Sequence, residues 1–248
     1  MERPIIGIVS QKVEGEKGRI FFERTSFSTV LAAKLSKQDA FPYGLVLNDN
    51  VTNEDYYRLF DGFVFQGGNK INAEQIMAMH YAIRSGKPIL GICMGMQTMA
   101  AYDYLYRLLN GNIVFEDVKR LLRAIDETYY LTAVSGHNKC DPFYIDDVEK
   151  SLHRVDLEKN CELSKIYGDH LDMPSVHNCA VCPEAVGNLF TVKGKTRDDV
   201  IEVLEGNGVN AIGVQFHPEI IPDGDTLFEN FANAARLVRH KWYSIYCF

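Results

Sequence analysis

Cys93 has the surroundings that most favour nucleophilic chemistry. It ends the apolar stretch Pro88–Cys93, and Gly91 and Gly95 flank it two residues away on either side. Small neighbours permit the sharp strand-to-helix turn of a nucleophile elbow. That turn places the sulfur at a helix N-terminus, where the dipole and free N–H groups stabilise a thiolate. The pattern predicts a nucleophile, with the Met94 N–H as an oxyanion donor; the alternative is a buried structural cysteine.

His217 and Glu219 follow a second apolar stretch, and they could supply a base and its orienting acid. Residues two apart in extended backbone point to the same side, so both side chains project together, and Pro218 stiffens the link between them. A carboxylate beside an imidazole fixes its tautomer and stabilises the imidazolium, which a cysteine nucleophile needs for its activation. The alternative is a turn-capping histidine beside a solvated glutamate.

Gly67 and Gly68 end a third apolar stretch, Gly62–Gln66. Their backbone N–H groups could supply a second donor to an oxyanion. The alternative is an ordinary tight turn.

The elements that must position these residues alternate between strand and helix in the first half of the chain. Short apolar runs predict strands, and apolar residues at helical spacing predict helices. The predicted strands are 5–10, 43–47, 62–66 and 88–93, and the predicted helices are 26–37, 72–84 and 94–109. Such alternation forms right-handed crossovers and a parallel sheet. Open α/β sheets bind ligands at the carboxyl ends of their strands, where Cys93 would lie.

The second half of the chain has strand patterns joined by short connections that contain Gly or Asp, which favours hairpins. The predicted strands are 153–157, 188–193, 200–205 and 211–216, and a final helix is predicted at 225–240. Residues 110–150 are expected to form a lid or an insertion. We therefore predict a single domain over residues 1–248: a three-layer α/β sandwich with a mostly parallel sheet and an antiparallel extension.

Composition restricts the possible partners. The chain has 248 residues, with 26 Lys and Arg against 33 Asp and Glu, so its formal net charge is −7. An acidic balance argues against non-specific nucleic-acid binding. No run of about 18 apolar residues is present, which argues against a membrane span. Six cysteines without a signal-peptide pattern indicate reduced thiols in a cytoplasm.

Together these motifs resemble the class I glutamine amidotransferase superfamily, over about residues 4–240. The features that carry the resemblance are the Gly-Gly after the third strand, the G-x-C-x-G-x-Q elbow at Gly91–Gln97 and V-Q-F-H-P-E at Val214–Glu219. Within this group the chain is most similar to the γ-glutamyl-γ-aminobutyrate hydrolase branch. The segments that follow the pattern of that branch are His153–Leu157, Leu163–Gly168, Ser175–His177 and Val200–Glu202.

The resemblance implies a flavodoxin-like fold and a cysteine-dependent hydrolase of γ-glutamyl amides that uses no metal and no organic cofactor. Carried over residue by residue, it makes Cys93 the nucleophile, His217 the general base and acid, and Glu219 the group that orients His217. The substrate would be a small γ-glutamyl molecule.

The resemblance also implies the groups around the substrate. The backbone N–H groups of Met94 and Gly68, or of Gly67, would form the oxyanion hole. Gln97 would help to hold the glutamyl portion, and Ser175–His177 belongs to a loop that shapes the pocket. The His-Gln that usually follows this segment in the branch is absent here, so the leaving amine stays open.

Three other functions fit parts of the sequence. A glutaminase subunit would keep the chemistry and deliver ammonia to a separate synthase partner. A binding protein would keep the fold without catalysis. The C-x-x-C of Cys179 and Cys182, next to His177, could be a zinc or redox site, although no second ligand pair has convincing spacing. A homo-oligomer is also possible.

The four remaining histidines have no motif around them. We expect them at the surface or on helices; they are His80, His137, His170 and His240.

Overall fold

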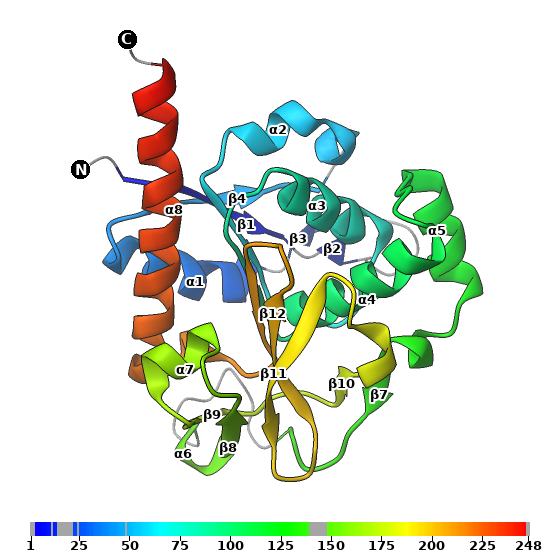
Figure 1. Ribbon diagram of the computed structural model, residues 1–248, viewed down its shortest axis with the longest axis vertical. Coiled ribbons are helices and arrows are strands. Elements are labelled where there is room, and N and C mark those ends of the chain that lie inside the picture. The colour runs from blue at the N-terminus through cyan, green and yellow to red at the C-terminus, as the bar shows by residue number, and fades with distance from the viewer. Residues whose placement is uncertain are drawn as a thin grey trace.

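A nine-stranded mixed sheet forms the centre of the computed structural model, which describes residues 3–10, 12–13, 22–23, 25–47, 49–138 and 148–246 (Figure 1). In spatial order its strands are β4 (Phe41–Leu45), β1 (Ile5–Val9), β5 (Gly62–Phe65), β6 (Ile89–Ile92), β13 (Ala211–Val214), β12 (Ile201–Gly206), β11 (Phe190–Thr196), β8 (Leu152–Leu157) and β9 (His170–Pro174). The first five are parallel to one another. The last four continue the sheet as antiparallel strands. The predicted fold class is confirmed.

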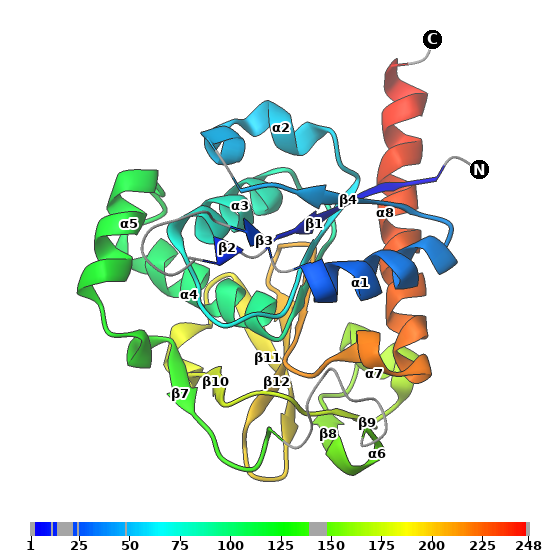
Figure 2. The same ribbon diagram turned by 180° about the vertical axis from the view of Figure 1, so that it is seen from behind.

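Helices cover both faces of this sheet. They are α1 (Thr25–Lys37), α2 (Glu54–Arg58), α3 (Ala73–Arg84), α4 (Met94–Leu108), α5 (Phe115–Ala124), α6 (Val148–Ser151), α7 (Glu162–Tyr167) and α8 (Asp225–Tyr246). Views from the two sides place α3, α4 and α5 on one side of the parallel strands and α1 and α8 on the other (Figures 1 and 2). None of the helices in the described ranges is both long and apolar enough to span a membrane.

The alternation of side chains along the strands produces two separate hydrophobic cores. On β5, Phe63 and Phe65 face the core that α3 and α4 cover, whereas Val64 faces the core that α1 and α8 cover. Successive residues of a strand point to opposite faces, and strands buried on both faces are apolar throughout. This is why the short apolar runs of the sequence correspond to central strands.

In the part of the chain that the structure describes, two smaller sheets lie outside the main one. β10 (Cys179–Val181) pairs with β7 (Leu131–Ala133), and β2 (Lys12–Val13) pairs with β3 (Phe22–Glu23). Short 3₁₀ helices within the described residues are η2 (Asp49–Thr52), η3 (Glu127–Tyr129), η5 (Pro183–Ala185), η6 (Pro218–Ile220) and η7 (Pro222–Gly224).

The segment that we expected to be a lid or an insertion is described over residues 110–138 and 148–150. It forms α5, which packs on α3, then η3, β7 and the start of α6. The rest of the predicted segment, 139–147, lies outside the described residues. A lid function stays a prediction.

Candidate functional site

Cys93 lies at the sharp turn between β6 and α4. Its backbone has φ 51° and ψ −109°, a conformation that a residue with a side chain rarely adopts, and it is the N-cap of α4. The Cys93 N–H donates to Val214 O at 2.7 Å, and its carbonyl accepts from the Gln97 N–H at 3.1 Å. The last bond of the parallel ladder and the first bond of the helix therefore hold the strained residue, as a nucleophile elbow requires.

The glycines beside Cys93 are needed because other groups pass close to the turn. A Cβ on Gly95 would lie 2.1 Å from Phe65 O, and a Cβ on Gly91 would lie 2.8 Å from Met99 Sδ. At either distance the neighbouring atom or the turn itself would have to move. The two glycines thus let α4 start directly against β5, which brings Cys93 next to the loop that follows β5.

His217 and Glu219 form a buried hydrogen-bonded pair just after β13. His217 Nδ1 lies 2.7 Å from Glu219 Oε1, and each residue is 2% exposed. The His217 N–H donates to Pro174 O at 3.2 Å, which fixes the backbone of the pair. Because Nδ1 faces the carboxylate, Nε2 is the nitrogen left for Cys93.

His217 also interacts with Cys93, and this contact alters its protonation. Burial alone would lower the pKa of His217, but the negative charges of Glu219 and of a Cys93 thiolate, with the hydrogen bonds to both groups, raise it well above its usual value. The imidazolium is therefore favoured beside a thiolate. The structure therefore brings together Cys93, His217 and Glu219, the three residues that the family resemblance assigned to one catalytic set.

Gly67 lies directly against this set. A Cβ at Gly67 would be 2.8 Å from His217 Cε1 and 3.5 Å from Cys93 Cβ. Its neighbour Gly68 is partly exposed, whereas Met94 is buried as the first residue of α4. The loop after β5 and the start of α4 thus border Cys93 from two directions. The use of their N–H groups for an oxyanion stays a prediction.

Gln97 lies one turn into α4, and protein groups already engage its amide. Its Nε2 donates to Cys179 O at 2.9 Å and to Gln215 Oε1 at 3.1 Å. The side chain is 7% exposed. The stretch that contains Cys179 is therefore attached to the helix that carries the elbow.

Ser175 and His177 are buried, and their polar atoms bond to other protein groups. Ser175 Oγ donates to His137 O at 2.6 Å. His177 Nδ1 lies 3.0 Å from Cys179 O, and its Nε2 lies 3.2 Å from Glu202 Oε1. Their contact with a substrate stays a prediction.

Glu202 is the centre of a cluster of three histidines. Its Oε1 lies 3.2 Å from His153 Nε2, 3.2 Å from His177 Nε2 and 3.6 Å from His137 Nδ1. Burial alone would raise the pKa of Glu202, but the three imidazoles lower it. Hydrogen bonding to Glu202 raises the pKa of His137 against the effect of burial, and Asp198 adds to the rise. Glu202 is therefore an ionised carboxylate in the protein interior.

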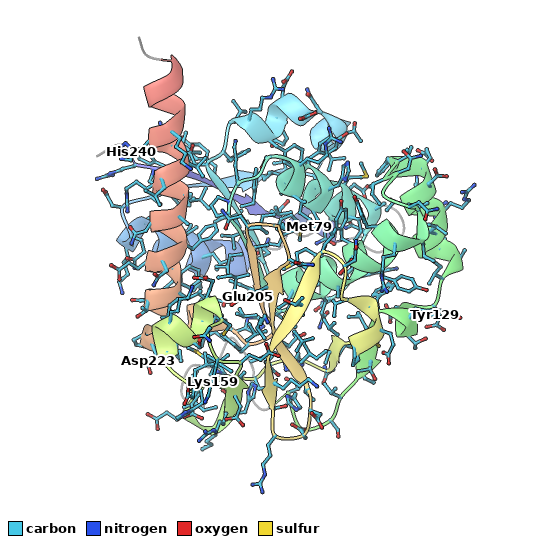
Figure 3. All side chains as sticks on the ribbon, in the orientation of Figure 1. Met79, Tyr129, Lys159, Glu205, Asp223 and His240 are labelled. Atoms are coloured by element: carbon cyan, nitrogen blue, oxygen red, sulfur yellow. The ribbon has the colours of Figure 1, made fainter. Side chains whose placement is uncertain are left out.

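The prediction that His137 is a surface or helix residue is wrong. His137 lies in a non-helical stretch after β7 and is only 5% exposed. No motif surrounds it, and the contacts that bury it come from residues 38 to 65 positions further along the chain. His80 lies on helix α3 and His170 is exposed on β9. His240 lies on α8 (Figure 3).

Cys179 and Cys182 are both free thiols. Burial raises the pKa of each, which disfavours the thiolate that a metal or a redox reaction uses. Within the described ranges, the His, Cys, Asp and Glu residues close enough to share one metal ion are His137, His177 and Glu202. The C-x-x-C therefore does not form a metal cluster with these residues.

Comparison with known proteins places these features in a family. The family model of Peptidase C26 matches residues 72–219, which contain the elbow and the His217–Glu219 pair. A glutamine amidotransferase-like protein of Rickettsia prowazekii is 22% identical over 298 aligned positions that cover 96% of this chain and 99% of that protein. The aminodeoxychorismate/anthranilate synthase component 2 of Bacillus subtilis is 24% identical over 221 positions, 82% of this chain and 95% of that protein.

Two further comparisons concern proteins of guanine nucleotide synthesis. The glutamine-hydrolysing GMP synthase of Vibrio vulnificus is 27% identical over 69% of this chain, which spans only 27% of that protein. Among solved structures, a Thermoplasma acidophilum protein assigned as one of the subunits of GMP synthase has a TM-score of 0.61 and 15% identity, with 98% of both chains covered. At this identity the structural similarity establishes the fold.

Proposed function

The chain belongs to the Peptidase C26 family, a class I glutamine amidotransferase-like group, and from this premise we propose that it hydrolyses a γ-glutamyl amide bond through a thioester on Cys93. The family makes it a hydrolase or amidotransferase. The observation that carries the finer proposal is the strained Cys93, with φ 51°, beside a histidine whose Nδ1 lies 2.7 Å from Glu219. A thiolate, an imidazolium and a carboxylate in this order are what acyl transfer from an amide needs.

In the first step the Cys93 thiolate attacks the carbonyl carbon of the amide. A C–S bond forms, and the carbonyl π electrons move to the oxygen. When the tetrahedral intermediate collapses, the C–N bond breaks and His217 Nε2–H gives its proton to the departing nitrogen. Ammonia or an amine leaves, and a γ-glutamyl thioester stays on Cys93.

In the second step water attacks the thioester, and His217 Nε2 accepts the proton of the water. The new tetrahedral intermediate expels the Cys93 thiolate, glutamate leaves, and the imidazolium and thiolate are restored. Glu219 holds the Nδ1–H of His217 through both steps, since its Oε1 lies 2.7 Å away. It stabilises the imidazolium and keeps Nε2 directed at the sulfur.

The oxyanion of each intermediate would be bound by the N–H of Met94 and by the N–H of Gly68 or Gly67. Met94 begins α4, so its N–H is one of the free donors at the helix N-terminus. Gly67 lies against both Cys93 and His217, which supports a second donor from this loop. Each such donor contributes about 3 kcal/mol in other acyl-transfer enzymes.

A second candidate is a glutaminase that supplies ammonia to a synthase. The similarity to a synthase component 2, over 95% of that protein's length, favours it. In this case the substrate is glutamine and the leaving group is ammonia, with the same residues in the same roles. A reducing compartment such as the cytoplasm suits both candidates, since the four described cysteines are unbridged.

The test measures glutamate release from glutamine, γ-glutamyl-γ-aminobutyrate and other γ-glutamyl amines and peptides. We expect turnover of one of these substrates by the wild-type chain and none by Cys93→Ala. Cys161→Ala is the matched control, because Cys161 is also buried but caps α7.

The outcomes separate the candidates. Fast hydrolysis of one γ-glutamyl amine supports the independent hydrolase. Slow glutamine hydrolysis that rises when a synthase is added supports the ammonia donor. Substantial activity in purified Cys93→Ala would contradict both.

A further inference from the structure

The cluster around Glu202 has the spacing of ligands around a single ion. One ligand atom from each of His137, His177 and Glu202 lies within 4.8 Å of the others, and all three residues are buried. The Oε1 of Glu202 is 3.2 Å from His177 Nε2 and 3.6 Å from His137 Nδ1. Bonds of about 2.0–2.2 Å at tetrahedral angles place neighbouring zinc ligands roughly 3.4 Å apart. The cluster therefore needs little movement to enclose an ion.

The hydrogen bonds at the outer nitrogens leave lone pairs toward the centre of the cluster. His177 Nδ1 lies 3.0 Å from Cys179 O, and a carbonyl oxygen only accepts, so Nδ1 carries the hydrogen. His137 Nε2 likewise lies 3.1 Å from Asp198 Oδ2. In each neutral ring the other nitrogen then has a lone pair that faces Glu202. Metal-binding histidines commonly donate their second N–H to a carbonyl or a carboxylate in this way.

Two members of the cluster have polar atoms without a hydrogen-bond partner within the described ranges. These atoms are Oε2 of Glu202 and both ring nitrogens of His153. His153 Nε2 lies 3.2 Å from Glu202 Oε1, yet the pair lacks the geometry of a hydrogen bond. A buried carboxylate is costly unless a positive charge compensates for it. A bound cation would compensate for the charge of Glu202.

We propose that His137, His177 and Glu202 bind a divalent metal ion, and that the ion is zinc. Imidazole nitrogens and a carboxylate oxygen are common zinc ligands, and three protein ligands leave the fourth tetrahedral position to water. Calcium and magnesium are disfavoured, since they select oxygen ligands. This departs from the expectation of no metal that the family resemblance gave.

The ion would connect the main sheet with two segments outside it. Glu202 lies on β12, His177 in the stretch between β9 and β10, and His137 after β7. In Figure 3, Glu205 marks the strand that carries Glu202. A site that ties three segments together would stabilise the wall next to Gln97 and would take no part in the acyl transfer.

The test begins with the metal content of the full chain, purified without chelators, dialysed, and then incubated with zinc sulfate. Cys93→Ser is measured beside the wild type, because a thiolate next to an imidazole could itself capture zinc. We expect one zinc per chain in both proteins. Cobalt(II) in place of zinc should give the visible absorption of a tetrahedral site without a thiolate charge-transfer band, which excludes Cys179 and Cys182 as ligands.

Two variants assign the ion to the cluster. Glu202→Gln should no longer retain stoichiometric zinc. Asp198→Asn removes only the partner of His137 Nε2 and should weaken zinc binding about 10-fold. The controls are Glu205→Gln, on the same strand as Glu202, and His170→Gln, an exposed histidine on β9; both should bind zinc as the wild type does.

The proposal is overturned if the wild type holds no stoichiometric zinc after incubation, because the cluster is then a protonated histidine–carboxylate network. It is also overturned if Glu202→Gln and Asp198→Asn bind zinc with wild-type affinity. Should Glu202→Gln fail to fold, Asp198→Asn and the cobalt spectrum decide, because the Asp198 side chain is 64% exposed and its replacement leaves the interior intact. None of these measurements depends on the proposed hydrolase activity.

Discussion

Replacing Gly67 with alanine tests whether Cys93 and His217 form the reacting pair. The new methyl carbon would lie 2.8 Å from His217 Cε1, whereas ordinary contact between such atoms begins at 3.4 Å. The difference, 3.4 − 2.8 = 0.6 Å, is the distance by which the ring or the loop must move. The ring has little freedom, since its Nδ1 is 2.7 Å from Glu219 Oε1 and the residue is 2% exposed.

The magnitude follows from the sensitivity of acyl transfer to geometry. A misplacement of 1 Å at a reacting group costs about 10²-fold in rate. A shift of about 0.6 Å should therefore lower kcat/KM roughly 10- to 100-fold, or about 1.4–2.7 kcal/mol of transition-state stabilisation. If the loop moves and the ring does not, kcat/KM should also fall, because Gly67 or Gly68 is the expected oxyanion donor.

The assay is glutamate release under kcat/KM conditions, together with the rate at which iodoacetamide alkylates Cys93. Alkylation reports the thiolate, so a displaced His217 should slow it as well. The matched control is Gly44→Ala, because a Cβ at Gly44 on β4 meets nothing within 4 Å. Thermal melts of both variants separate a local effect from a loss of folding.

Wild-type kcat/KM in a correctly folded Gly67→Ala chain would refute the reasoning. It would mean that the pair tolerates displacement and that the chemistry takes place elsewhere. An equal loss in Gly44→Ala would also refute it, because the effect would then not depend on contact with His217.

Two further substitutions test the electrostatics of the site and the stability of the fold. Glu219→Gln removes the carboxylate charge beside His217. Burial lowers the pKa of His217, whereas the charges of Glu219 and Cys93 raise it. Without the Glu219 charge, the pKa of His217 should therefore fall. The imidazolium is then lost at lower pH, so the alkaline limb of kcat/KM should move down by roughly one pH unit or more, and an unmoved limb would contradict this role. Asp103→Ala should lower the free energy of unfolding in urea by about 3 kcal/mol, because the buried Oδ2 of Asp103 accepts three backbone N–H bonds from residues 188–190. Asp103→Asn keeps an acceptor oxygen and should lose only about 1 kcal/mol; equal losses would show that these bonds do not matter.

The central strands and the elbow could be predicted because local patterns determine them. Strand β6 and helix α4 meet within one residue of the predicted junction, since the apolar run and the two glycines are contiguous in sequence. His217 and Glu219 are two residues apart, so extended geometry alone puts them side by side. The pairing of Cys93 with His217 was implied by the family resemblance and follows from the parallel pairing of β6 with β13.

The features that could not be predicted from the sequence, strand β9 and the burial of His137, depend on contacts between distant segments. Strand β9 contains an exposed histidine and a terminal proline, so its pattern is weak, and it is stabilised by pairing with β8 at the edge of the sheet. His137 stands in a polar stretch without periodicity, and it is buried by Glu202, which lies 65 residues further on. No local signal can show a cluster that the folded antiparallel extension assembles.

Strands β12 and β13 connect the cluster around Glu202 with the site around Cys93. This connection limits how the cluster can affect the Cys93 site. The Gln215 N–H donates to Glu202 O at 2.8 Å, while Gln215 Oε1 accepts from Gln97 Nε2 at 3.1 Å. A change at Glu202 therefore reaches Gln97, which is expected to hold the glutamyl portion, through two hydrogen bonds. Cys93 takes part in neither bond, so an ion at Glu202 would influence KM and leave the alkylation rate of Cys93 unchanged. That separation distinguishes a positioning role for the cluster from a catalytic one, because a catalytic ion would alter both.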